Sequence, residues 1–174
     1  MYGHNSSMRW SILLPVVGAC LAAAIPLARY AEKQRDEAVA VNALRQIQDA
    51  QERVRDAAGA YATVLATLVE GCQGGAAALP ATVLGELTAA GYVLHLRAAV
   101  DAAPGGTDCA GHPLASDYYV AASPATAGEA AEKAFAGRAD GRLFVFVDGI
   151  APSEADIASG LATPLDEINS FKIP

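Results

Sequence analysis

The chain has 174 residues, of which 53% are hydrophobic, and a formal net charge of -7. This length is enough for one ordinary domain, and an acidic chain repels the phosphates of nucleic acids. No basic cluster follows Arg55 to offset that repulsion. Composition therefore removes nucleic acid from the expected partners.

The first predicted element is a transmembrane helix over residues 10–28, the uncharged and mostly apolar stretch between Arg9 and Arg29. Nineteen helical residues rise about 28 Å, which is close to the thickness of the hydrocarbon core of a bilayer. The short segment 1–9 is expected on the cytoplasmic side of a bacterial inner membrane and the bulk of the chain in the periplasm. Because positive charges flank the helix on both sides, this orientation depends on the disulfide and the resemblance given below.

Small residues dominate the middle of this segment, and small residues let a second helix approach closely within a membrane. The predicted helix-packing face comprises Gly18, Ala19, Ala22 and Ala23. The expected partners are therefore membrane lipid and the transmembrane helices of a larger complex.

Two alternatives involve cleavage of the apolar segment. VGAC at 17–20 is a loose match to a lipoprotein processing site with Cys20 as the acylated residue, and an ordinary signal peptide would remove the segment altogether. The residues after Cys20, LAAAIPLA, are apolar, whereas a lipoprotein tether is usually polar. A retained anchor is the preferred interpretation.

An amphipathic helix is predicted over residues 29–70, where the pattern becomes charged and proline is absent. Apolar positions recur there at steps of three and four, which places them on one stripe of a helix. The stripe comprises Leu44, Ile47, Gln51, Val54, Ala58, Tyr61, Leu65 and Leu68. Gly59 is a candidate interruption, which would leave a long helix to Ala58 and a short one after it.

The remaining residues, 71–174, are predicted to form a small α+β domain with an irregular tail from residue 151. A short helix is expected over 79–91, with a proline near its start and a glycine just past its end. The hydrophobic period then changes to two, and the predicted strands are 92–100, 117–123 and 142–149. We expect a three-stranded antiparallel meander whose apolar face is covered by the helical stripe.

Two of the three cysteines, Cys72 and Cys109, lie beyond the apolar segment. If the domain is outside the membrane, these two are predicted to form a disulfide, because disulfides persist in oxidising compartments. The alternative is two unrelated buried thiols. Neither a CxxC motif nor a Cys and His spacing suggests a metal.

Three stretches of sequence together carry a resemblance to a known family. The first is GACLAAAIP at 18–26, in which a glycine and a proline punctuate an apolar helix. The second has Gly59, Tyr61 and Ala62 at the end of the amphipathic helix, and the third comprises the strand sequences AAGYVLHL, DYYVAASP and GRLFVFVDGIA. In this order they resemble the type IV pilins and pseudopilins. The resemblance implies a pilin-like fold, in which a long N-terminal helix is first transmembrane and then amphipathic and packs on a small extracytoplasmic sheet.

The amino terminus departs from that family, whose members carry a glycine cleavage site followed by phenylalanine and, five residues in, a glutamate that pairs with the neighbouring subunit. Counting back from Pro26 places Arg9 at the glutamate position and the cleavage position between His4 and Asn5. With a cation in place of the carboxylate, filament assembly would bury an additional charge. The expected function is a structural subunit of a larger membrane complex, for example a respiratory or photosynthetic one. A minor pilin or pseudopilin is the alternative.

Motifs for catalysis or cofactor binding are not evident, so neither an enzyme activity nor a cofactor is expected. Asp140, Asp148, Glu154 and Asp156 cluster near the last predicted strand, but they lack the alternating oxygen ligands of calcium loops. The acidic cluster is therefore not expected to bind a metal.

Overall fold

The computed structural model describes residues 10–71, 76–126 and 133–167, with side chains described from Arg29 onward. The chain divides into two compact units, Met1–Arg35 and Asp36–Pro174. All of the strands given below belong to the second unit.

The longest element is α1 (Trp10–Ala58), a helix of 49 residues. In the first unit, Gln34 on this helix donates a hydrogen bond of 3.2 Å to the hydroxyl of Tyr30, one turn earlier. The helix ends where Gly59 adopts a φ of 79°, a conformation that is cheap for glycine and costly for other residues. The predicted helix over 29–70 is therefore wrong beyond Ala58, and the interruption at Gly59 is confirmed.

Three short elements follow α1, namely β1 (Tyr61–Ala62), α2 (Leu65–Val69) and α3 (Ala81–Ala89). Pro80 is the N-cap residue of α3, and Gly91, with a φ of 78°, comes just after its C-cap residue. The short helix predicted over 79–91 is confirmed, with ends that differ by two residues, as is usual for helix boundaries.

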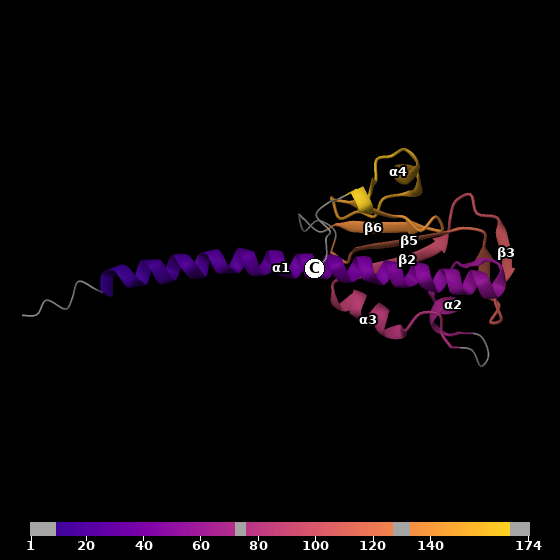
Figure 1. The fold of residues 1–174 in the computed structure, drawn as a ribbon, viewed down its shortest axis with the longest axis horizontal. Helices are drawn as coiled ribbons and strands as arrows, with labels where there is room; N and C mark the ends of the chain where they lie inside the picture. Colours follow the sequence, from indigo (N-terminus) through magenta and orange to yellow (C-terminus); the bar gives the residue numbers. More distant parts are fainter. Residues whose placement is uncertain (1–9, 72–75, 127–132, 168–174) are drawn as a thin grey trace, which may run out of the picture. The chain divides into compact units, whose positions relative to one another are not determined.

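Among the described residues, the strands form one five-stranded and one three-stranded antiparallel sheet (Figure 1). The larger sheet has the order β2-β5-β6-β7-β8, with β2 (Tyr92–Ala98), β5 (Tyr118–Pro124), β6 (Ala134–Arg138), β7 (Leu143–Phe146) and β8 (Thr163–Pro164). The smaller sheet has the order β1-β4-β3, with β3 (Pro104–Thr107) and β4 (Pro113–Ala115).

The predicted three-stranded meander is wrong in strand number and in one pairing. The strands predicted over 92–100, 117–123 and 142–149 correspond to β2, β5 and β7, but β6 lies between β5 and β7. Because β6 has the sequence AFAGR, its intrinsic β propensity is low, and pairing on both sides determines its conformation. The tail predicted to be irregular contains α4 (Glu154–Ala158), β8 and the short 3-10 helix η1 (Leu165–Glu167).

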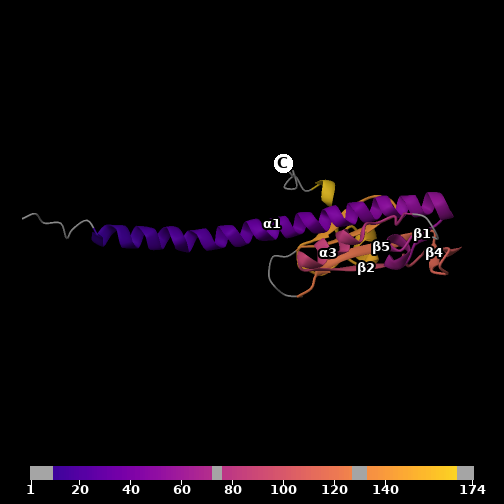
Figure 2. The same cartoon turned by 90° about the horizontal axis from the view of Figure 1, so that it is seen from below.

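The second half of α1 runs along one face of the five-stranded sheet, as Figures 1 and 2 show. Leu44 and Ile47 of α1 are fully buried and belong to the same core cluster as Tyr118, Val120 and Phe135. Full burial of a side chain of this size contributes about 1.5–3 kcal/mol. The coarse prediction, an α+β chain with a long N-terminal helix and antiparallel sheets, is confirmed.

Gly137 on β6 permits the close approach of α1 to the sheet. A Cβ atom at this position would lie 2.9 Å from Cδ2 of Leu143 and 3.1 Å from Nε2 of Gln48, which belongs to α1. Both distances are shorter than ordinary van der Waals contacts. A larger residue at 137 would therefore displace a neighbouring β7 side chain or the helix side chain above it.

Candidate functional site

The predicted membrane segment, 10–28, is helical in the structure, but its side chains lie outside the described residues. The same holds for the predicted helix-packing face of Gly18, Ala19, Ala22 and Ala23, so the packing of these residues stays a prediction. Within the part of the chain that the structure describes, no helix combines the length and the apolarity that a membrane crossing requires.

The predicted sheet-packing stripe comes together in one cluster, although its members belong to three elements. Leu44 and Ile47 on α1, Tyr61 on β1 and Leu68 on α2 are buried in it, and Val54 and Leu65 pack against it half-buried. Tyr61, Leu65 and Leu68 reach the cluster after the chain has turned at Gly59, so the prediction that one helix carries all eight residues of the stripe is wrong. Of the other two, Gln51 is buried and Ala58 is exposed. The spacing of three and four residues nevertheless identified six residues that the fold brings into one hydrophobic cluster.

Gln51 joins the long helix to the chain that folds back beside it. The side chain is fully buried, and its Nε2 donates to the carbonyl oxygen of Ala62 at 2.9 Å, while its Oε1 accepts from the backbone N–H of Ala62 at 2.8 Å. Gln51 thus provides the donor and the acceptor that a neighbouring strand would give to β1. The only sequence signal for this role is a glutamine in the middle of an apolar stripe.

A partly buried ion pair joins the first turn of α1 in the second unit to the residue that precedes β6. Glu37 is 3% exposed, and its Oε2 lies 2.9 Å from Nζ of Lys133. The hydroxyl of Tyr92 on β2 donates to the carbonyl oxygen of Lys133 at 3.0 Å. Removing one partner of a fully buried ion pair costs about 3–5 kcal/mol, and the cost is smaller here because Lys133 is partly exposed. The contact links the helix to the chain that enters β6.

The predicted disulfide falls at the turn between β3 and β4. Cys109 is disulfide-bonded in the structure. Its predicted partner, Cys72, lies outside the described residues, so the pairing of Cys72 with Cys109 stays a prediction.

Asp108 organises the turn that carries Cys109. Its Oδ1 accepts from the backbone N–H groups of Ala110 at 2.9 Å and His112 at 2.8 Å. Its Oδ2 accepts from the hydroxyl of Thr67 at 2.8 Å and lies 3.0 Å from Nδ1 of His112. Burial raises the pKa of this carboxyl, but the hydrogen bonds from the backbone of His112, from Thr67, from the His112 ring and from Ala110 outweigh it and lower the pKa to about 2. Asp108 is therefore ionised at neutral pH and acts as a hydrogen-bond acceptor in the turn.

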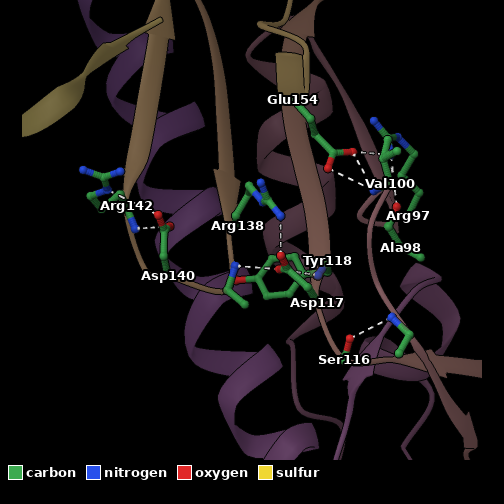
Figure 3. Close-up of polar contacts among 12 residues, drawn as sticks. Arg97, Ala98, Val100, Ser116, Asp117, Tyr118, Arg138, Asp140, Arg142 and Glu154 are labelled. Carbon is green, nitrogen blue, oxygen red and sulfur yellow. Dashed lines mark hydrogen bonds and ion pairs between the residues drawn. The ribbon is translucent and has the colours of Figure 1, made fainter. Parts of the chain in front are cut away.

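Polar contacts fasten α4 to the face of the five-stranded sheet that α1 does not cover (Figure 3). Oε1 of Glu154 lies 2.5 Å from the guanidinium of Arg97 on β2, and both carboxylate oxygens accept from the backbone N–H of Val100, at 3.2 and 3.0 Å. The Arg97 guanidinium also stacks 4.5 Å from the ring centroid of Tyr119, whose hydroxyl donates to the carbonyl oxygen of Pro152. These contacts join α4 and the residue before its cap to two neighbouring strands.

Two further ion pairs lie on or near the ends of β5, β6 and β7, also in Figure 3. Asp117 accepts from Arg138 at 2.5 Å and from the backbone N–H of Ala139 at 3.2 Å, and the hydrogen bond to Asp117 raises the pKa of Arg138 above its already high value. Arg142 and Asp140 pair at 3.2 Å across the turn that joins β6 to β7. Both pairs connect residues within or beside neighbouring strands, so their evident role is in the fold.

The acidic cluster noted in the sequence is divided by the fold among different partners. Glu154 pairs with Arg97, and Asp140 pairs with Arg142. Asp148 accepts from the backbone N–H of Ile150 at 3.0 Å, and Asp156 forms the capping box of α4 with Ser153. Each of these carboxylates is therefore bonded within its own local element or to its own cation.

The comparisons with known proteins add no family to this geometry. No family model, curated protein or solved structure matches the chain. The features that bear on function are therefore the long helix, its attachment to the sheet and the surfaces of the second unit.

Proposed function

We propose that this protein is a non-enzymatic structural subunit, anchored in a bacterial inner membrane by one transmembrane helix, with its α+β domain in the periplasm. Segment 10–28 would dock among the transmembrane helices of a larger complex. A respiratory or a photosynthetic complex would be a suitable host.

The observation that supports this proposal best is the continuity of α1. One helix begins with the apolar segment and, without an intervening linker, supplies the buried residues Leu44, Ile47 and Gln51 of the second unit. An anchor that is continuous in the chain with the core of the domain suits a subunit whose folded domain must stay attached to an assembly in the membrane.

The chemistry of the described side chains also supports a structural role. The buried carboxylates Glu37 and Glu154 each pair with a cation of another element, and the ionised Asp108 holds a turn together. Groups used in this way stabilise the fold and are poor proton donors or acceptors for catalysis.

Gentle detergent extraction, followed by identification of what co-purifies, tests this proposal. We expect the full-length chain in the membrane fraction, together with partner subunits in fixed ratio. By the helical period, Ala22 lies on the predicted packing face and Ala24 nearly opposite to it, so Ala22→Leu should release the partners and Ala24→Leu should not. Recovery of the protein from an aqueous fraction with its first thirty residues removed would contradict the anchor. Recovery as a lone, monodisperse membrane protein would contradict the docking.

The second candidate function is a minor pilin or pseudopilin of a type IV pilus or a type II secretion system. Its support is the order of elements together with the position of Gly59, Tyr61 and Ala62 at the end of the long helix. Mass spectrometry of the mature amino terminus separates the two functions. Loss of the first few residues with methylation of the new terminus would favour the pilin role, and an unprocessed terminus would favour the structural subunit.

A further inference from the structure

A cavity of about 620 Å³ opens beside the Asp108 turn, between the last turns of α1, α2 and the segment that leads to α3. Its lining includes Arg53, Val54, Ala57, Thr67, Ala77 and Asp108. Cavities of about 300–1,000 Å³ are the usual size for small-molecule sites. The whole lining belongs to the second unit, so the cavity does not depend on the membrane segment.

Small apolar side chains form half of the lining. Val54, Ala57 and Ala58 contribute from α1, and the alanines at 76–78 contribute from the segment that leads to α3. A wall of methyl groups offers a flat surface with no hydrogen-bonding preference. It suits the apolar body of a ligand, whose burial contributes about 25 cal/mol per Å².

Arg53 and Asp108, the two charged residues of the described lining, differ in the hydrogen-bonding positions that they can offer to a ligand. The four acceptor positions of the Asp108 carboxylate are taken by Ala110, by Thr67 and by two groups of His112. Arg53 uses its Nη2 for one hydrogen bond of 2.6 Å to the carbonyl oxygen of Ala78. Across the described residues, it makes no ion pair with a carboxylate. A guanidinium has five N–H donors in a planar fork that matches a carboxylate.

We propose that this cavity binds a small amphipathic carboxylate, with its apolar body on the alanine wall and its anionic group on Arg53. A cationic ligand would be repelled by Arg53 and would find no free acceptor position on Asp108. The net charge of -7 repels multiply charged anions at long range, which favours a monoanion with a substantial apolar part. This proposal is independent of the proposed function in the membrane.

The probe for the test is a fluorine-labelled phenylbutyrate, and the comparison ligand is its neutral amide, which has the same shape. The full-length chain is held in lipid nanodiscs, and fluorine NMR follows each titration against empty nanodiscs. From typical ligand efficiency, we expect a dissociation constant on the order of 1 mM for the carboxylate and binding about tenfold weaker for the amide.

Two variants and one control locate the site. Arg53→Gln should weaken carboxylate binding about tenfold and leave amide binding unchanged, because it removes the charged donor and keeps much of the side chain. Ala57→Trp places a large side chain from an exposed helix position into the cavity and should abolish binding of both ligands. Arg45→Gln makes the same charge change at an exposed position of α1 outside the cavity lining, and should alter neither titration.

Equal binding of the carboxylate and the amide to the wild-type chain would overturn the recognition by Arg53, even if Arg53→Gln failed to fold. Failure of both ligands to bind at tens of millimolar, roughly tenfold above the expected dissociation constant, would overturn the cavity as a site. Binding that persists unchanged in a folded Ala57→Trp variant would place the ligand elsewhere and would also overturn the proposal.

Discussion

The two faces of the five-stranded sheet are covered in different ways. Toward α1, large side chains such as Tyr118 and Phe135 are buried in one continuous core cluster. On the opposite face, a small cluster contains Tyr119 with Ala121 and Ala136, packed against the segment around α4. The first face is held by buried apolar area, and the second depends more on charged and hydrogen-bonded contacts.

The length of the covering helices explains this difference. α1 presents many turns to the sheet, whereas α4 has five residues, too few for a helix to be stable alone in water. The capping box of α4 and the contacts of Glu154 provide the stabilisation that so short a helix cannot obtain from buried apolar area. Apart from the Glu37–Lys133 pair, the α1 face should therefore depend less on pH and salt than the opposite face does.

The largest expected effect comes from the α1 face. Leu44→Ala removes a fully buried side chain from the core cluster and should lower the free energy of unfolding by about 3–4 kcal/mol. On the opposite face, Ile157→Ala removes a half-buried side chain and should cost only about 1 kcal/mol. Urea denaturation followed by near-UV circular dichroism measures both. Equal losses would remove the distinction between the two faces.

The next effect tests Gln51, whose buried side-chain amide lies within the apolar face. Gln51→Leu replaces the polar side chain by an apolar one of similar size and leaves both backbone groups of Ala62 without the partner that Gln51 provides. We expect a loss of about 2–3 kcal/mol, because buried polar groups left unpaired cost their full desolvation. Gln46→Leu is the matched control, since Gln46 is exposed on the same helix.

Amide hydrogen exchange refines the Gln51 prediction. The N–H of Ala62 should exchange faster in Gln51→Leu than in the wild-type chain, whereas the N–H groups of β6 should keep their protection. A variant that loses stability without faster exchange at Ala62 would show that the amide acts through packing and not through its two hydrogen bonds.

The third prediction concerns acid and the Asp108 turn, where polar contacts again replace burial. The pKa of Asp108 falls from 3.8 to about 2 on folding, so the folded chain binds this proton more weakly than the unfolded chain does. The resulting stabilisation of about 2 kcal/mol is complete above about pH 4 and is lost as the pH falls toward 2. Urea titrations across this pH range should show the loss in the wild-type chain and a shallower pH dependence in Asp108→Asn. Parallel curves for the two proteins would contradict the assignment.

How much of this organisation the sequence predicts depends on how local each signal is. The end of α1 at Gly59, the α3 helix between Pro80 and Gly91, and the burial of Leu44 and Ile47 follow from period, proline and glycine, all of which act within a few residues. The position of β6 between β5 and β7 does not, because AFAGR is a strand only through its neighbours.

Side-chain contacts between distant elements were equally beyond the sequence. Glu154 and Arg97 belong to a helix and a strand whose proximity depends on the complete sheet, and both appear as ordinary surface charges in the sequence. The Asp108 turn has a local signal, an aspartate followed three residues later by a glycine, which is typical of side-chain-capped turns. The cavity beside it combines α1 with residues far along the chain, so no local pattern predicts it.

The smallest expected change in stability distinguishes a buried carboxylate with several hydrogen bonds from an exposed surface ion pair. Glu154→Gln keeps the shape and one acceptor oxygen of the side chain but removes the charge that faces Arg97. It should lower the free energy of unfolding by about 1 kcal/mol, because the group is buried and also accepts a hydrogen bond from the backbone of Val100. Arg142→Gln breaks the pair with Asp140, whose side chains are 60% and 46% exposed, and should change stability by less than about 0.5 kcal/mol, since solvent and salt screen exposed pairs. Urea denaturation at low and high salt measures both variants. If Arg142→Gln lost as much stability as Glu154→Gln, exposed charges would also hold the sheet face that α1 does not cover. A larger loss for Glu154→Gln assigns that role to the buried carboxylate that fastens α4.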